Sequence, residues 1–205
     1  MPIPGDVTDQ ELYRLSRDGN EEAFVALYRR RYHAVYRFAA QMTGDEALAE
    51  DVTQEVFVLL ARGALEFDPA RGTLRALLYG VARNLVRRRS ERNRGHVPLE
   101  PEDDNGVTPD ALVDRSDVLL DLTRSQTVER VRQAVASLPA HYREVVVLCD
   151  LHEQTYEEAS AAIGCAVGTV RSRLHRARGM LLEKLQVPET TTRLGIPHTS
   201  GGILV

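Results

Sequence analysis

A run of acidic residues and prolines near the middle of the chain divides it into two parts. Between residues 99 and 121, eight Asp and Glu residues face only Arg115, so the local charge is −7 (1 − 8). The string PLEPEDDNGVTPD at its centre holds three prolines and a glycine with few apolar residues. Such a segment cannot bury enough surface to offset the entropy cost of becoming ordered. We therefore predict a flexible acidic linker over residues 96–124.

Apolar residues recur at helical spacing on both sides of this linker, and the first series follows Asn20, a typical helix N-cap. The periodic positions are Phe24, Leu27, Tyr28, Val35, Phe38, Met42, Val52, Val56, Leu59 and Leu60 before the linker, and Val128, Val131, Val135 and Leu138 after it. No sustained period-two alternation indicates strands. We predict an all-α fold with two small helical domains, residues 9–95 and 125–187, and a mobile tail over residues 188–205 that is rich in Pro, Gly and Thr.

The composition excludes several classes of protein. The 205 residues are 43% hydrophobic and 27% charged, which is typical of a folded protein. No apolar run approaches the roughly 18 residues of a membrane span, and the first residues lack the basic and apolar stretches of a signal peptide. We expect a cytoplasmic protein.

No enzyme motif is present: HExxH, GxSxG, a Walker loop and GxGxxG are all missing. We expect neither catalytic residues nor a cofactor, a metal or a small-molecule substrate. A zinc or redox site at Cys149, His152 and Cys165 is an alternative. It is disfavoured because Cys149 follows Val145 and Leu148 in an apolar helical series, which indicates a core thiol.

The distribution of charge matters more than its total. A formal net charge of −4 argues against nucleic acid as a partner, because phosphate binding needs concentrated positive charge. Residues 71–94, however, carry eight arginines and one glutamate, giving +7, and residues 169–184 carry five basic residues and one glutamate, giving +4. Two basic blocks therefore flank the acidic linker, and each is suited to bind phosphates.

The segment from Thr155 to Arg178 is typical of a helix-turn-helix. Thr155 is a suitable N-cap, Gly164 is suited to the turn, and a longer helix is predicted to begin near Val167. In that helix an inward stripe is predicted at Val170, Leu174, Ala177, Leu181 and Leu185.

The opposite face of this second helix is basic. Its candidate DNA-binding residues are Thr169, Arg171, Ser172, Arg173, His175, Arg176 and Arg178. Arg171, Ser172, His175 and Arg176 have the placement of base-reading residues in a recognition helix, whereas Arg173 and Arg178 suit phosphates. The alternative is an ordinary amphipathic helix with a solvated basic face, in which His175 contacts nothing.

The motifs DVTQEVF, FDPARGT and ARN in the first domain, and GTVRSRLHRAR in the second, carry a family resemblance. In this order, over about residues 9–187, the chain resembles bacterial RNA polymerase sigma factors of the sigma-70 family, in the extracytoplasmic-function (ECF) group. The first domain resembles region 2 and the second resembles region 4. The resemblance implies a non-enzymatic polymerase subunit that directs promoter-specific initiation.

The resemblance also implies a set of polymerase contacts. Region 2 would bind the coiled coil of the largest polymerase subunit, through Asp51, Gln54, Glu55 and Val58, and region 4 would bind the flap of the second-largest subunit. The four residues stand at i, i+3, i+4 and i+7, which places them on one helix face. The alternative is a solvated acidic face. By the same resemblance the linker threads through polymerase channels.

Two promoter contacts are implied as well. The basic face in region 4 would read the upstream (−35) element as duplex DNA. Region 2 would capture the melted downstream (−10) element, with a flipped base in a pocket at the FDPARGT loop. The residues implied are Phe67, Asp68, Arg71, Thr73, Arg75, Tyr79, Arg83, Asn84, Arg87 and Arg88. Arg75, Tyr79 and Arg83 are spaced by four and share a helix face, although Tyr79 is equally suited to the core.

Relatives in this family are commonly held inactive by an anti-sigma factor, and we expect one here. The expected partners are thus core RNA polymerase, promoter DNA and an anti-sigma factor. The competing hypothesis is a stand-alone helix-turn-helix regulator, which would bind its operator without polymerase.

Overall fold

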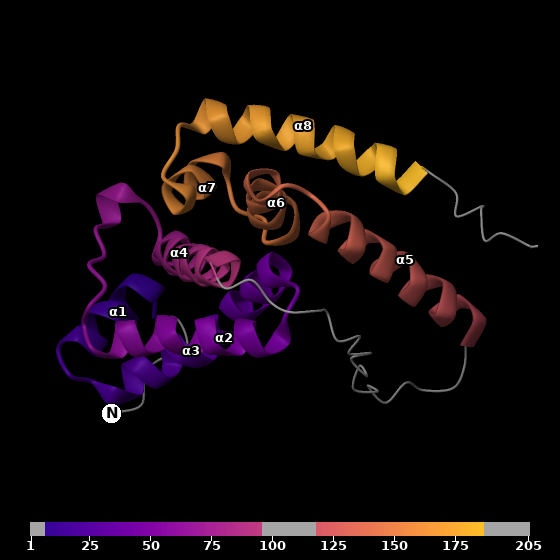
Figure 1. Cartoon of the computed structure of the whole chain (residues 1–205). Helices are drawn as coiled ribbons and strands as arrows, with labels where there is room; N and C mark the ends of the chain where they lie inside the picture. The colour runs from indigo at the N-terminus through magenta and orange to yellow at the C-terminus, as the bar shows by residue number, and fades with distance from the viewer. Residues whose placement is uncertain (1–6, 96–117, 187–205) are drawn as a thin grey trace, which may run out of the picture.

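The computed structural model describes residues 7–95 and 118–186, and within these ranges every regular element is a helix (Figure 1). The first half contains α1 (Asp9–Arg17), α2 (Glu21–Thr43), α3 (Glu46–Ala61), the 3₁₀ turn η1 (Pro69–Arg71) and α4 (Leu74–Gly95). The second half contains α5 (Val118–Ala136), α6 (Ala140–Val146), the π-helical turn η2 (Val147–Leu151), α7 (Tyr156–Ile163) and α8 (Val167–Gln186). The all-α prediction is confirmed.

Side-chain caps set the helix starts in the first half. Asn20, the predicted cap, accepts a hydrogen bond from the N–H of Ala23 at 3.0 Å, and Asp45 accepts one from the N–H of Leu48 at 2.9 Å. Each bond satisfies an N–H that has no partner inside the helix. Gly44 adopts the left-handed conformation, with φ of 71°, and separates α2 from α3. The short turn at Gly44 makes α2 and α3 neighbours in an antiparallel pair.

The core of the first half forms where α1, α2, α3 and α4 meet. Leu12, Leu27, Phe38, Val52 and Val56 are all fully buried there. The predicted apolar periodicity is therefore confirmed at most positions, but Tyr28 is 37% exposed. None of the helices in the described ranges is long and apolar enough to cross a membrane.

In the second half, α5 projects away from the other helices (Figure 1). As a result Val128 and Val131, which belong to the predicted apolar series, are exposed, whereas Val135 and Leu138 are buried. Helix α5 contacts α8, α2 and α6, and Arg130, between the two exposed valines, donates a hydrogen bond to the Leu185 carbonyl of α8 at 3.2 Å. The helix begins at Val118, before the predicted domain start at residue 125. Residues 96–117 of the predicted linker and the predicted tail, residues 188–205, lie outside the described residues.

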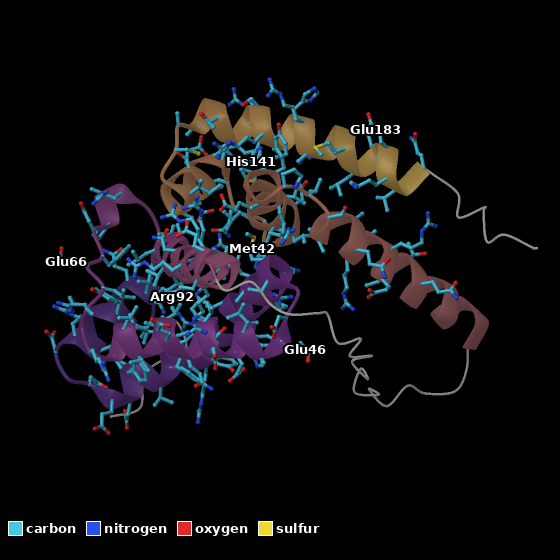
Figure 2. All side chains as sticks on the ribbon, in the orientation of Figure 1. Met42, Glu46, Glu66, Arg92, His141 and Glu183 are labelled. Atoms are coloured by element: carbon cyan, nitrogen blue, oxygen red, sulfur yellow. The ribbon has the colours of Figure 1, made fainter. Side chains whose placement is uncertain are left out.

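The two halves pack directly against each other. Helix α4 lies along α7, and α2 contacts α5, α6 and η2. One continuous apolar cluster includes residues from both halves, such as Leu78 of α4 and Ile163 of α7. Side chains of both halves fill the space between α4 and the helices α6 and α7 (Figure 2). The candidate sites therefore lie on one body with a shared core.

Candidate nucleic-acid interface

The helix-turn-helix forms as the sequence predicts. The Thr155 hydroxyl accepts the N–H of Glu158 at 3.1 Å, while the Glu158 carboxylate accepts the N–H of Thr155 at 2.9 Å, which completes a capping box. Gly164 closes α7 in the left-handed conformation, with φ of 75°. The turn directs α8 across α6 and α7, so that Val170, Leu174 and Ala177 are buried. The outer end of the predicted stripe, Leu181 and Leu185, is only half-buried.

The opposite face of α8 is open to solvent. Arg171, Ser172, His175 and Arg176 are exposed, and Thr169 and Arg173 are half-buried. The Arg171 guanidinium lies 5.6 Å from the ring centre of Tyr156, which steadies it without neutralising its charge. Within the described residues, no ion pair engages Arg171, Arg173 or Arg176. This face can therefore offer several unneutralised arginines to a polyanion.

Arg178 differs from these arginines. Its guanidinium binds both carboxylate oxygens of Asp150, with Nε 3.1 Å from Oδ2. The hydrogen bond to Asp150 raises the pKa of Arg178 above the usual value of an arginine. The pair ties α8 to the end of η2, so Arg178 has a structural partner in addition to any phosphate.

The loop between α3 and α4 carries the first of the predicted downstream-element residues. The Asp68 carboxylate accepts the N–H of Ala70 at 2.9 Å and starts the turn η1. Phe67 packs edge-on against Tyr13 of α1, with ring centres 5.5 Å apart. A cavity of about 450 Å³ opens between α1 and this loop, lined in part by Phe67, Pro69 and Arg14. Arg71 and Thr73, later in the loop, are exposed and do not line this cavity.

The predicted residues of α4 fall into two groups. Asn84, Arg87 and Arg88 are exposed, and Arg87 has only a loose contact with Glu91, at 3.7 Å. Arg75, Tyr79 and Arg83 do share one face, as their spacing predicts, but that face lies against the second half. Tyr79 is 2% exposed. In this arrangement it is therefore a core residue, which was the alternative interpretation.

Three residues of the second half that have no predicted DNA-binding role meet this face. Glu158 binds Arg75 at 3.1 Å, Glu144 lies 2.9 Å from Arg83, and His152 contacts the Tyr79 hydroxyl at 2.9 Å. Burial alone would raise the pKa of Glu158, but the Thr155 N–H and the Arg75 guanidinium outweigh it and lower that pKa. No sequence signal marks these pairs, because their members are about 60 to 85 residues apart.

The predicted polymerase-binding residues lie on one exposed face of α3. Asp51 and Gln54 are exposed, Glu55 is half-buried, and Val58 is 43% exposed although apolar. Arg89 of α4, which the sequence marks only as part of a basic block, bridges the two carboxylates. Its guanidinium lies 3.2 Å from Asp51 and 2.8 Å from Glu55. The face thus combines charged and amide side chains with an exposed valine at its C-terminal end.

The two cysteines are free and only half-buried. Burial raises the pKa of the Cys149 thiol to about 11, so it is protonated at neutral pH. Across the described residues, no group of three His, Cys, Asp or Glu side chains is placed to hold a metal ion.

Comparison with known families matches both halves of the chain in order. The family described as Sigma-70 region 2 matches residues 27–95, and Sigma-70, region 4 matches residues 128–181. The ECF RNA polymerase sigma factor SigC of Mycobacterium tuberculosis is 34% identical over 173 residues, covering 84% of this chain and 89% of SigC. SigE of Mycolicibacterium smegmatis is 37% identical over 164 residues, covering 76% of this chain and 59% of SigE. This chain therefore spans less than two thirds of that SigE.

Solved structures agree with this match. The structure of CnrH in complex with the cytosolic domain of CnrY is 27% identical, with a TM-score of 0.61, covering 86% of this chain and 96% of that one. The sigma factor RpoE in complex with the anti-sigma factor NepR, from Bartonella quintana, is 25% identical, with a TM-score of 0.57, covering 80% of this chain and 98% of that one.

Proposed function

Because the chain belongs to the sigma-70 family, as an ECF RNA polymerase sigma factor, we propose that it binds core polymerase and directs initiation at promoters with two spaced elements. Polymerase supplies the catalysis, and this chain supplies recognition. The observation that carries the proposal is the open basic face of α8, presented by a capped helix-turn-helix. A stand-alone regulator is not supported, because region 2 precedes region 4 in the same chain.

The α8 face reads the upstream element as duplex DNA. Arg171 and Arg176 have the geometry to bind guanine edges bidentately in the major groove, and Ser172 and His175 can form single hydrogen bonds. Arg173 contacts phosphate and fixes the orientation of the helix. Arg178 does the same when the protein is bound to DNA.

The loop at Phe67 and the basic face of α4 capture the melted downstream element. Arg71, Arg87 and Arg88 are available for phosphates, while Phe67 and the cavity beside it suit an unstacked base. Asp68, Thr73 and Asn84 supply polar groups for base edges. Arg75, Tyr79 and Arg83 complete this surface once it is uncovered.

The α3 face docks on the coiled coil of the largest polymerase subunit. An exposed valine next to acidic and amide side chains suits a partner helix that carries apolar and basic side chains. Region 4 contacts the flap of the second-largest subunit. An anti-sigma factor is a further partner, since the RpoE relative has been solved in complex with one.

Transcription with purified components tests the proposal. Added to core polymerase from its own bacterium, the chain should give run-off transcripts from a subset of fragmented genomic templates. Val58→Glu should abolish both core binding and transcription, because it replaces the exposed apolar residue of the α3 face with a charge.

Val25→Glu is the matched control, since Val25 is 41% exposed but lies on α2 and not among the predicted polymerase-binding residues of α3. It should transcribe normally. A folded chain that neither copurifies with core polymerase nor yields any transcript would contradict the proposed function.

A further inference from the structure

Helix α1 precedes the segment that matches region 2, since that segment begins at residue 27. The helix nevertheless contacts the loop that carries Phe67 (Figure 1). Resting on the function proposed above, we infer that α1 is part of the single-strand site, and that Tyr13 is a positioning residue that holds this loop ready for the melted strand. Tyr13 acts through the loop.

The loop between α3 and α4 has little support of its own. Residues 62–73 are all described, and the short turn η1 is the single regular element among them. Asp68, Arg71 and Thr73, which are proposed to bind the strand, are exposed. A loop of this kind is mobile unless neighbouring elements hold it. Its affinity for a strand therefore depends on the contacts that fix it before the strand arrives.

Tyr13 holds the loop at two points. Its hydroxyl donates a hydrogen bond to the Leu65 carbonyl at 2.5 Å. Its ring meets Phe67 edge-on, with ring centres 5.5 Å apart and an angle of 77° between the planes. The Leu65 side chain is buried, and Phe67 is half-buried. One side chain of α1 thus fixes both the backbone that leads into the loop and the aromatic ring proposed to meet an unstacked base.

Arg17, one turn after Tyr13, makes a further contact with the start of the loop. Its guanidinium donates a hydrogen bond to the Gly63 carbonyl. Gly63 adopts the left-handed conformation, with φ of 66°, and a Cβ at this position would lie 2.5 Å from Nη1 of Arg17. Because glycine has no side chain there, the end of α1 can approach the loop backbone closely.

Helix α1 is itself anchored to α2. The Asp9 carboxylate pairs with Arg30 at 3.0 Å and with Arg31 at 2.5 Å, and Arg30 also donates a hydrogen bond to the Val7 carbonyl at 2.7 Å. Leu12, in the middle of α1, is fully buried. The helix therefore connects the loop to the packed core of the first half.

The cavity of about 450 Å³ lies between the two elements that Tyr13 joins. Residues of α1 line one side, and Phe67 and Pro69 line the other. The bond from Tyr13 to the Leu65 carbonyl ties these two sides together, so it sets how far apart they stand. A pocket that keeps both walls in place surrounds more of a bound base than a pocket with one wall free to move.

Removal of one oxygen atom tests this role. Tyr13→Phe keeps the ring and loses the hydroxyl. The full-length chain is bound to core polymerase from its own bacterium, and a fluorescein-labelled template is pre-melted over the downstream element of a promoter that the wild type transcribes. The affinity of the variant holoenzyme for this template should fall about three- to tenfold in anisotropy titrations, as expected for the loss of one hydrogen bond.

Tyr28→Phe is the matched control and should bind the template as the wild type does. It removes the same atom from a tyrosine of the first half that is 37% exposed. Within the described residues, no hydrogen bond engages the Tyr28 hydroxyl.

Base discrimination separates positioning from a general loss of stability. It is measured on templates in which each base of the melted non-template strand is changed in turn. A loosely held loop weakens the contacts that favour the matched base, so the affinity for the matched strand should fall while that for mismatched strands stays nearly unchanged. A smaller folded fraction would weaken both equally. Tyr13→Leu also loses the ring contact with Phe67 and should reduce discrimination further.

Two results would overturn the inference: a Tyr13→Phe holoenzyme that binds the matched strand as tightly as Tyr28→Phe does, or one that loses affinity for matched and mismatched strands by the same factor. Failure of the wild type to give any run-off transcript would count against the proposed function. Normal wild-type transcription with either overturning result would count against the role of Tyr13 alone.

Discussion

Acidification should destabilise the protein through His152. The ring is 8% exposed and is held in the neutral form, with Nε2–H donated to Gln41 and Nδ1 accepting the Tyr79 hydroxyl. Burial, followed by the charges of Arg37 and Arg75, lowers the pKa of His152 to about 4. A protonated ring would lose the bond from Tyr79 and carry a charge into the interface.

The size of the effect follows from proton linkage. The unfolded chain takes up a proton near pH 6.5, whereas the folded protein does so only near pH 4. This contribution to stability is therefore fully present above pH 6.5 and is lost as the pH falls from 6.5 to 4. The loss between pH 7 and pH 5 should be about 2 kcal/mol, and it should reach about 3 kcal/mol near pH 4.

Urea unfolding followed by circular dichroism at pH 7, 6 and 5 measures this loss. His152→Gln should be less stable than wild type at pH 7, because it breaks the contact with Tyr79, but its stability should fall by about 2 kcal/mol less on acidification. His175→Gln removes an exposed histidine and should keep the wild-type dependence. Carboxylate titration is common to all three proteins and cancels. Equal pH dependence in wild type and His152→Gln would refute the reasoning.

Three further substitutions test other parts of the fold. Leu174→Ala should lower the free energy of unfolding by about 2 to 5 kcal/mol in urea titrations, because Leu174 is 1% exposed, whereas Leu182→Ala at a 59% exposed site should change it little. Thr155→Ala removes a helix cap and should cost about 1 kcal/mol, measured as a lower Tm. Arg176→Ala should weaken holoenzyme binding to a matched upstream element by about 1 to 3 kcal/mol; equal losses on a scrambled element would indicate phosphate contact.

Local features of the sequence predicted the secondary structure well. Asn20 and Thr155 are caps because their side-chain oxygens reach N–H groups only three residues away, and Gly164 ends α7 because the turn needs a left-handed residue. Both causes act over a single helical turn, so they can be seen in sequence. The exposure of the first part of the α5 series could not be predicted from sequence, because Val128 and Val131 have the same helical spacing as the buried Val135 and Leu138.

The candidate site divides in the same way. The spacing of Arg75, Tyr79 and Arg83 predicts that they share a face, and the position of Arg171 and Arg176 after the turn predicts a basic recognition face. What each face meets was not predictable. Arg89 bridges Asp51 and Glu55, which are 38 and 34 residues away in sequence. How α4 crosses α3 decides that the guanidinium reaches both carboxylates.

By itself, the sequence determined the helices, their caps, the division of charge along the chain and the family to which the chain belongs. All of these depend on residues within a turn of one another or on motifs in a fixed order. Only the tertiary structure decided that α4 packs on the second half, so that Glu144, His152 and Glu158 meet Arg83, Tyr79 and Arg75. The physical reason is that such pairing depends on complementary shape, with Gly80 admitting the α7 backbone, and on charges that the fold brings together across the linker.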